Sequence, residues 1–343
     1  MTSLHPLVQL TLARVREFYR EPEAMFWTYG FPLIMAIALG IAFRERPVER
    51  VAVDVAQESA QVAEILSKIE GVEVEVHPTQ RCRERLRTGK TDVVVVGTTN
   101  GYTFLYDETK PGSLLARNTV NDLLQRAAGR ADPMVTNDVI LQEVGGRYID
   151  FLVPGLLGMS LMGGGIWGVG FVTVDMRIRK LLKRFLATPM KRGHFLASLM
   201  LSRMLFMVPE VLLLLLFARF VFGVVNYGDW LVLIGLILLG ALMFSGIGLL
   251  LASRAQTLET ISGLMNLVML PMWIMSGIFF SVERFPEAVR PFLQLLPLTP
   301  VIHAMRSVML EGTALTALGL ELGSMLLWSV VSFALALKWF RWG

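Results

Sequence analysis

Six long apolar stretches constrain the fold of this chain more than any other feature of its sequence. Each approaches or exceeds the about 20 residues that a helix rising about 1.5 Å per residue needs to cross a hydrocarbon core of about 30 Å. Because 54% of the residues are hydrophobic and only 17% are charged, a soluble fold is not expected. The sequence predicts a membrane all-α bundle of six transmembrane helices. They lie near 25–43, 148–174, 195–222, 230–253, 258–280 and 317–340.

Positive charge indicates which ends of these spans face the cytoplasm. Cytoplasmic loops of membrane proteins carry an excess of lysine and arginine. Such residues gather before the first stretch, within 175–194, at Arg254 and after the last stretch. Both termini are therefore predicted to be cytoplasmic. The single cysteine, Cys82, cannot form an internal disulfide, so cysteine usage leaves the redox compartment open.

Four segments follow from this topology. They are an amphipathic cytoplasmic interface helix, the first transmembrane helix, an extracytoplasmic domain and a five-helix transmembrane domain, at 1–24, 25–43, 44–147 and 148–343. The last segment includes a basic cytoplasmic loop at 175–194. The first segment has apolar residues at helical spacing and is expected to end at Pro22.

The segment 44–147 carries the pattern of a small α/β domain. Its valine-rich and aromatic runs are typical of strands, and the segments between them have helical spacing. The resulting order, βαβαββα, is typical of one α/β layer structure inserted into the bundle. The strands are expected at 51–55, 72–76, 93–96 and 102–106, and the helices at 59–69, 82–87 and 114–127.

The loop 175–194 contains the stretch RIRKLLKRFLATPMKRG, which starts at Arg177 and carries seven basic residues and no acid. Ile178, Leu181, Leu182, Phe185 and Leu186 follow the spacing of one helix face, opposite Arg177, Lys180, Lys183 and Arg184. This predicts a single amphipathic helix that Pro189 ends. Because the charge lies beside the membrane, no nucleic acid is expected as a partner. Anchoring to anionic lipid and docking of a protein remain as alternatives.

Glu210 is the clearest charged residue inside a predicted span. An ionisable group at mid-membrane costs at least about 2.5 kcal/mol, and such groups usually face a protein interior or a wet path. Arg203 lies two turns earlier on nearly the same face and is expected to share its surroundings. Two interpretations stay open: a structural contact between helices, or a role in transport. Arg219 and Asp150, near span ends, are expected to snorkel.

No motif in the chain predicts an enzyme. The GGGIWG at 163–168 formally matches a dinucleotide fingerprint, but it lies within an apolar span, where glycines for close helix packing explain it better. Residues 89–91 imitate the end of a phosphate loop without its first glycine. No cofactor is therefore expected on this chain. No metal is expected either, because none of the four histidines has a second ligand at zinc spacing. They are His5, His77, His194 and His303.

The segment 270–312 resembles the signature of ABC-2 type permeases, the membrane subunits of bacterial ABC exporters. It reads LPMWIMSGIFFSVERFPEAVRPFLQLLPLTPVIHAMRSVMLEG. The Ala-Thr-Pro at 187–189 also resembles the first cytoplasmic loop of that family, and the order of segments is similar along the whole chain, as in relatives with a domain between spans one and two. The signature residues are Ser276, Gly277, Pro286, Pro297, Thr299, Pro300, Arg306 and Gly312.

The resemblance implies a permease of the bacterial plasma (inner) membrane. ATP and Mg would be bound by a separate cytosolic ABC ATPase subunit, and the permease would pair with a second copy or a similar chain. The implied cargo is a hydrophobic or amphipathic compound, such as a drug, antibiotic or lipid-like molecule. Export of sodium or another ion, and a non-transporting sensor that uses the outer domain, are the alternatives.

The resemblance also implies roles for particular residues. Contact with the ATPase is expected at Phe18, Arg20, Lys183, Arg184, Phe185, Leu186, Thr188 and Pro189. The substrate path is expected at Met159, Met162, Trp167, Glu210, Asn266, Met269 and Trp273.

Overall fold

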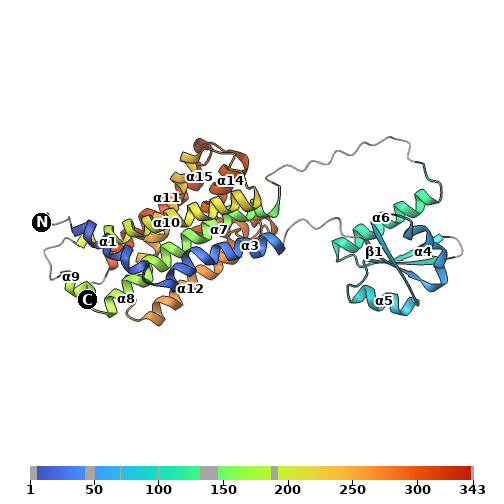
Figure 1. Cartoon of the computed structure of the whole chain (residues 1–343), viewed down its shortest axis with the longest axis horizontal. Helices are drawn as coiled ribbons and strands as arrows, with labels where there is room; N and C mark the ends of the chain where they lie inside the picture. The colour runs from blue at the N-terminus through green and yellow to red at the C-terminus, as the bar shows by residue number, and fades with distance from the viewer. Residues whose placement is uncertain are drawn as a thin grey trace. The chain divides into compact units, whose positions relative to one another are not determined.

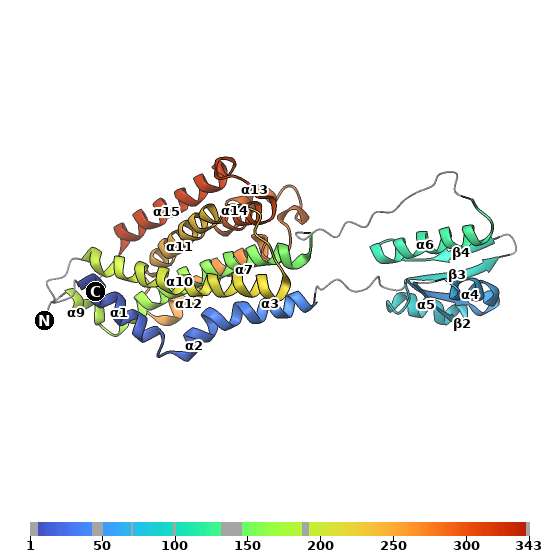
Figure 2. The ribbon, with the colours of Figure 1, turned by 45° about the horizontal axis from the view of Figure 1, so that its top comes forward.

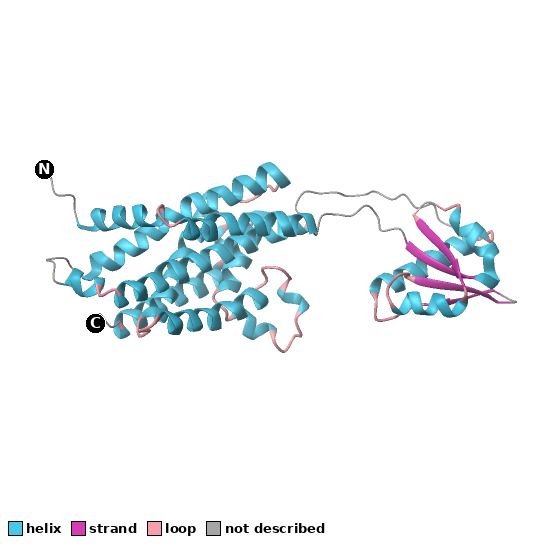
Figure 3. Ribbon diagram, turned by 60° about the horizontal axis from the view of Figure 1, so that its bottom comes forward, coloured by secondary structure: helices cyan, strands magenta, loops and turns pink. Residues whose placement is uncertain are grey.

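The computed structural model describes residues 6–42, 51–69, 71–98, 101–131, 146–186 and 192–340. The chain forms two compact units, of which one comprises Met1–Arg44 with Gln142–Gly343 and the other Glu45–Leu141. Within the described residues, the first unit is helical and all strands belong to the second (Figure 3).

The described residues of the helical unit include six helices that are long and apolar enough to cross a membrane. This confirms the number and approximate positions of the predicted spans. The fifth is shorter than predicted: it ends at Met275 because Ser276 and Gly277 turn the chain, with Gly277 at a left-handed φ of 85°. The six are Pro22–Ala42, Tyr148–Ile178, His194–Phe222, Trp230–Ala252, Leu258–Met275 and Gly319–Trp339.

Several spans are built from more than one element. The first comprises α2 (Pro22–Met25), the π-helical η1 (Phe26–Gly30) and α3 (Phe31–Ala42). The second comprises α7 (Tyr148–Gly165), the π-helical η3 (Ile166–Phe171) and α8 (Val172–Ile178). The others are α10 (Arg192–Phe222), α11 (Trp230–Ala252), α12 (Leu258–Met275) and α15 (Gly319–Trp339).

The second span is the most buried of the six and packs closely on α11. A Cβ placed on Gly165 would lie 2.5 Å from the Cβ of Phe244, and one on Gly170 would lie 2.7 Å from the carbonyl oxygen of Gly248. Side chains at these positions would push the two helices apart. The glycines in and just after 163–168 therefore permit close helix packing, as the sequence predicted.

Two short helices between α12 and α15 were not predicted. They are α13 (Arg290–Gln294) and α14 (Leu298–Glu311). At about 1.5 Å per residue α14 is too short to cross a bilayer, and most of its residues are buried against α7, α11 and α15. In the bundle, α13 and α14 lie at one end, whereas α1 (Pro6–Phe18), α9 (Leu181–Leu186) and the C-terminal end of α15 lie at the other (Figures 1 and 2).

Both amphipathic stretches differ from their predictions. The first helix, α1, already ends at Phe18, and Pro22 begins α2, where a first-turn proline costs no hydrogen bond. The basic stretch is not one helix, because α8 ends at Ile178 and α9 starts at Leu181. Between them Lys180 has a φ of 58°, which breaks the helix. Pro189 lies outside the described residues.

The second unit is the predicted α/β domain, with its elements in the order βαβαββα. The sheet order is β2-β1-β3-β4, in which β4 alone is antiparallel to its neighbour. Val53 and Val55 of β1 pack under α4 and α6, whereas Asp54 between them faces α5. The bounds are β1 (Val51–Ala56), α4 (Ala60–Ser67), β2 (Val72–His77), α5 (Thr79–Arg87), β3 (Val93–Thr98), β4 (Gly101–Leu105) and α6 (Pro111–Ala127).

Candidate functional site

Two charged side chains of α10 form an ion pair inside the helical bundle. Nη2 of Arg203 donates to Oε2 of Glu210 at 2.7 Å, and each side chain is only 5% exposed. A separation of seven residues places them two turns apart on nearly the same face of one helix. The sequence predicted the shared face, and the structure adds the direct pairing.

A glycine of α7 makes room for this pair. A Cβ placed on Gly164 would overlap the guanidinium of Arg203, whereas one on the neighbouring Gly163 would meet no atom within 4 Å. Nη2 of Arg203 also lies 3.5 Å from the carbonyl oxygen of Ser160, one turn earlier on α7. The guanidinium therefore crosses the face of α7 at a point where only glycine fits.

The energetics of such a pair argue against stability as its main purpose. Replacing a buried ion pair with well-packed apolar residues is often neutral or stabilising, whereas removing one partner costs about 3–5 kcal/mol. Moreover, Nε of Arg203 is buried and donates to no acceptor among the described residues. An apolar core would hold α7 and α10 together at lower cost, so the pair is a candidate for a functional role.

An aromatic cluster connects α1 to the same part of α10. The ring of Phe18 stacks on Phe206 with centroids 4.2 Å apart, and it meets Tyr29 edge-on at 5.7 Å. The hydroxyl of Tyr29 donates to the carbonyl oxygen of Phe206 at 3.4 Å. Because Phe206 lies between Arg203 and Glu210 on α10, this cluster attaches α1 to the turns that carry the ion pair.

The structure places the predicted ATPase contacts in different environments. Phe18 faces α10 as described, whereas Arg20, Lys183 and Arg184 are exposed. Lys183 and Arg184 lie on α9, which Leu182 attaches to the bundle through its buried side chain. The side chains of Phe185 and Leu186, and the whole of Thr188 and Pro189, lie outside the described residues.

Arg177 does not lie on the exposed charged face where the sequence predicted it. Its Nη1 donates to the carbonyl oxygen of Ala252 at 2.7 Å, and its Nη2 lies 3.4 Å from that of Ser253. Instead Ile178, assigned to the apolar face, is exposed. The prediction was wrong because the helix breaks at Lys180, so residues before and after the break do not share faces.

The residues predicted to line the substrate path lie in different environments. Met159, Met162 and Met269 are buried and pack in the core of the bundle. Trp167 and Trp273 are half-buried. Asn266 is exposed on α12 and Glu210 is in the ion pair. Of the predicted path residues, Met159 and Met162 thus lie on the same helix as Gly164, and Asn266 of α12 is exposed.

The signature residues hold α14 in place. Nη2 of Arg306 donates to the carbonyl oxygens of Gly277 at 2.9 Å and Phe151 at 3.2 Å, and its guanidinium lies 3.6 Å from the centroid of the Phe151 ring. Arg306 thus joins α14 to α7 and to the turn after α12. Ser276 is buried at that turn.

The remaining signature residues shape the ends of α14. Oγ1 of Thr299 donates to the carbonyl oxygen of Leu293 at 2.7 Å, with Pro297 just before the helix and Pro300 in its first turn. Gly312 ends the helix at a left-handed φ of 66°. Pro286 lies exposed in the preceding loop. This part of the signature therefore specifies a fold.

Asp150 was predicted to snorkel, and this prediction was wrong. Its side chain is 1% exposed and lies 2.9 Å from Nη2 of Arg147. Nη1 of Arg147 also donates to the carbonyl oxygen of Phe222, which joins the start of α7 to the end of α10. Burial is tolerated because the carboxylate is paired. Arg219 is exposed.

The α/β domain contains one cluster of potential metal ligands among the described residues: Asp54, Glu75 and His77, whose ligand atoms lie within 4.8 Å of one another. Arg85 already pairs with both carboxylates, through Nε to Asp54 at 2.9 Å and Nη2 to Glu75 at 3.0 Å. The hydrogen bond with His77, together with Arg85, holds the pKa of the Glu75 carboxyl below its usual value. The cluster is thus an ion-pair network, and spacing along the chain did not predict it because Asp54 comes from the neighbouring strand.

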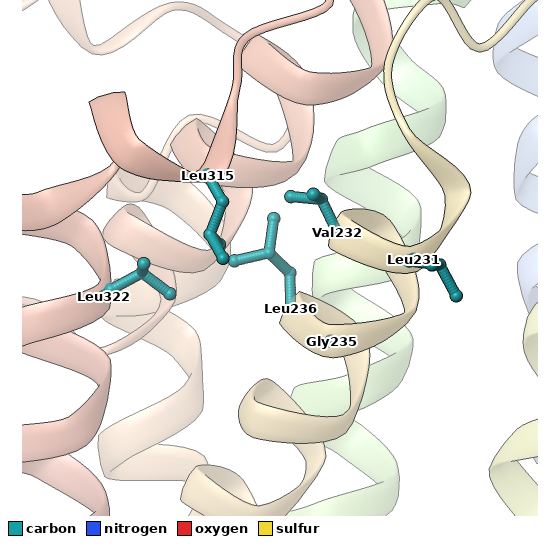
Figure 4. A pocket seen from close by; sticks show the side chains of 6 residues that line it. All are labelled: Leu231, Val232, Gly235, Leu236, Leu315 and Leu322. Carbon is teal, nitrogen blue, oxygen red and sulfur yellow. The ribbon is translucent and has the colours of Figure 1, made fainter.

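An apolar pocket of about 370 Å³ lies between α11 and the segment that leads into α15 (Figure 4). No side chain that lines it is polar, so it offers nothing that would orient a substrate. Figure 4 shows Leu231 turned away from Leu315 and Leu322. The pocket is lined by Leu231, Val232, Gly235, Leu236, Leu315 and Leu322.

These features define a multi-pass α-helical membrane protein that carries a small α/β domain between its first two spans and a buried ion pair in its third. Residues 23–338 match the family described as ABC-2 family transporter protein, and the chain belongs to that family. It is accordingly a transporter permease, a class of membrane subunit that normally pairs with an ATPase subunit.

Three similar proteins illustrate the range of the family. Nodulation protein J of Rhizobium meliloti (strain 1021) is 26% identical over 196 residues, which cover 56% of this chain and 73% of that protein. Nodulation protein J of Bradyrhizobium diazoefficiens is 25% identical over 201 residues, covering 57% and 75%. Linearmycin resistance permease protein LnrN of Bacillus subtilis (strain 168) is 24% identical over 174 residues, covering 51% and 45%.

Proposed function

We propose that this chain is the permease subunit of an exporter that moves a hydrophobic or amphipathic compound out of a bacterial plasma membrane. The observation that carries the proposal is the buried Arg203–Glu210 pair, which lies within the bundle of an ABC-2 family transporter and is joined through Phe206 to α1. The similarity to a linearmycin resistance permease supports an antibiotic as the cargo.

In this proposal ATP and Mg are bound by a separate cytosolic ATPase, and this chain binds no cofactor. The ATPase docks at the end of the bundle that carries α1 and α9, where Lys183 and Arg184 are exposed. Both termini are cytoplasmic and the α/β domain is extracytoplasmic, which agrees with the excess of basic residues at that end. Two permeases, identical or similar, form the working unit.

The desolvation cost of the ion pair lowers the free-energy difference between a closed and an open state of the bundle. When α7 and α10 are closed on each other, the pair is dehydrated and Nε of Arg203 lacks an acceptor. Opening a path beside α10 would hydrate the charges and recover part of their desolvation cost. The two states then lie close in energy, and a partner that binds them with different affinity shifts the equilibrium.

The test uses inside-out vesicles from cells that express the chain with the ABC ATPase that co-purifies with it. We expect ATP-dependent uptake of linearmycin or of a hydrophobic cationic dye. Uptake of ²²Na⁺ without dye would favour the ion-exporter alternative. If no ATPase co-purifies and no cargo moves, the exporter proposal is wrong, and the non-transporting sensor is favoured.

A further inference from the structure

Arg177 joins four segments at the end of the bundle that carries α9. Besides its contacts with Ala252 and Ser253, its Nη1 donates to the carbonyl oxygen of Ala255, in the turn between α11 and α12. Its guanidinium lies 5.3 Å from the ring centroid of Phe340, just after α15. One side chain of α8 thus contacts the end of α11, the following turn and the end of α15.

The chemistry of these contacts makes them strong and fixes their geometry, so Arg177 holds α8 firmly against the end of α11. The last carbonyls of a helix have no partner within the helix and carry the negative end of its dipole, so a cation there is favoured. A planar guanidinium can donate to several carbonyls at once, and a charge-assisted hydrogen bond is about twice as strong as a neutral one. The acceptor residues Ala252, Ser253 and Ala255 are themselves buried, which shields these hydrogen bonds from water.

The helical path is interrupted three residues after Arg177. Lys180 adopts a left-handed φ of 58°, which is unfavourable for a residue with a Cβ, and α9 follows directly. A force on α9 therefore acts across a sharp turn on the end of α8, in addition to acting on the bundle through the buried side chain of Leu182. The attachment of α8 to its neighbours decides which spans move with it.

We propose that Arg177 is a positioning residue through which a displacement of α9 is transmitted to α11, α12 and α15. This inference rests on the proposed function, because it assumes that a partner ATPase acts on α9. The permease without Arg177 would still bind its partner, since the side chain faces the bundle. It would lose the coordinated movement of the spans.

Arg179 provides a matched control for this proposal. It lies two residues further along, has a side chain that is 66% exposed, and pairs with Asp175 of α8 at 2.9 Å. Replacing it with glutamine removes the same charge from the same stretch without touching α11 or α15. An effect of charge alone, through lipid anchoring or steering of the partner, would be equal in R177Q and R179Q. An effect of position would appear only in R177Q.

The experiment uses the full chain in nanodiscs with Cys82 replaced by serine, and spin labels on cysteines at the exposed positions 178 and 256, on opposite sides of the Arg177 contact. The distance distribution is measured by electron paramagnetic resonance for the permease alone and with the co-purified ATPase and ATP. Transport per ATP hydrolysed and co-purification of the ATPase are measured for R177Q, R177K and R179Q.

In R177Q we expect the distance distribution to widen at least twofold and transport per ATP to fall at least fivefold, with partner binding unchanged. R177K keeps the charge but cannot bridge several carbonyls, so we expect intermediate values. Equal effects of R177Q and R179Q, or a loss of transport and ATP hydrolysis in R177Q by the same factor as the loss of folded protein, would overturn the proposal. Failure of the wild type to bind any ATPase would instead overturn the proposed function.

Discussion

At the scale of single residues, the buried ion pair separates two roles that the sequence left open. A structural contact should be replaceable by apolar side chains of similar volume, since buried pairs contribute little net stability. We expect the double variant R203M/E210L to keep the thermal stability of the wild type, whereas transport falls at least tenfold. The single variant Glu210→Gln leaves Arg203 buried without its partner, so we expect it to lose about 3–5 kcal/mol in the free energy of unfolding as well as export. Normal export by the double variant would assign the pair to structure alone.

The contact of Gly164 with Arg203 provides a sharper prediction. Gly164→Ala forces the guanidinium out of its place and separates it from Glu210, so we expect a loss of about 3–5 kcal/mol in the free energy of unfolding. Gly163→Ala meets open space and gains helix propensity, so it should be neutral or slightly stabilising. Thermal unfolding in detergent compares the two. Equal melting temperatures for both variants would contradict the assigned packing.

These residues also show what a sequence can reveal at this scale. The spacing of Arg203 and Glu210 on one helix was sufficient to predict a shared face. The need for glycine at 164 and not at 163 was not predictable, because it depends on the distance between α7 and α10. The same reason applies to Arg177, whose acceptors at the end of α11 and in the turn after it are 75 and 78 residues away in the chain.

At the scale of elements, the strands of the α/β domain were predictable because β-branched runs favour a pleated surface in any context. In contrast, α14 was missed, since prolines interrupt its start and it is too short to span. The break at Lys180 was missed because a left-handed residue other than glycine leaves no pattern in the sequence. Where tertiary contacts decide the backbone, periodicity alone is misleading.

The packing of α1 on α10 can be tested through Phe18. Phe18→Ala removes a half-buried ring stacked on Phe206 and releases α1 from the bundle. The expected loss in stability is below the about 1.5–3 kcal/mol of a fully buried side chain. We expect hydrogen exchange in α1 to accelerate at least tenfold and transport to fall. Leu12→Ala removes an exposed side chain of the same helix and serves as the control. Unchanged exchange in both variants would mean that Phe18 does not hold α1.

The ion-pair network of the α/β domain predicts a pH dependence. The pKa of Glu75 in the folded protein is lowered from 4.5, so its contribution to stability is present above about pH 4.5 and is lost as the pH falls through the lower, folded value. We expect this domain to lose stability as the pH falls through that range, followed as a lower midpoint of its thermal unfolding. In Glu75→Gln the acid-dependent part of the loss should be smaller. The same acid sensitivity in this variant would exclude Glu75 as its source.

At the scale of the whole molecule, six spans require that both ends of the helical unit face the same side of the membrane, and charge predicts that this side is the cytoplasm. Single cysteines in a chain with Cys82→Ser test this. Leu115→Cys, exposed on α6, should react with an impermeant maleimide in intact cells, whereas Arg179→Cys, exposed after α8, should react only after permeabilisation. The Cys82→Ser chain without an added cysteine sets the background. Labelling of residue 179 in intact cells would invert the topology and place α9 beyond the reach of any cytosolic ATPase.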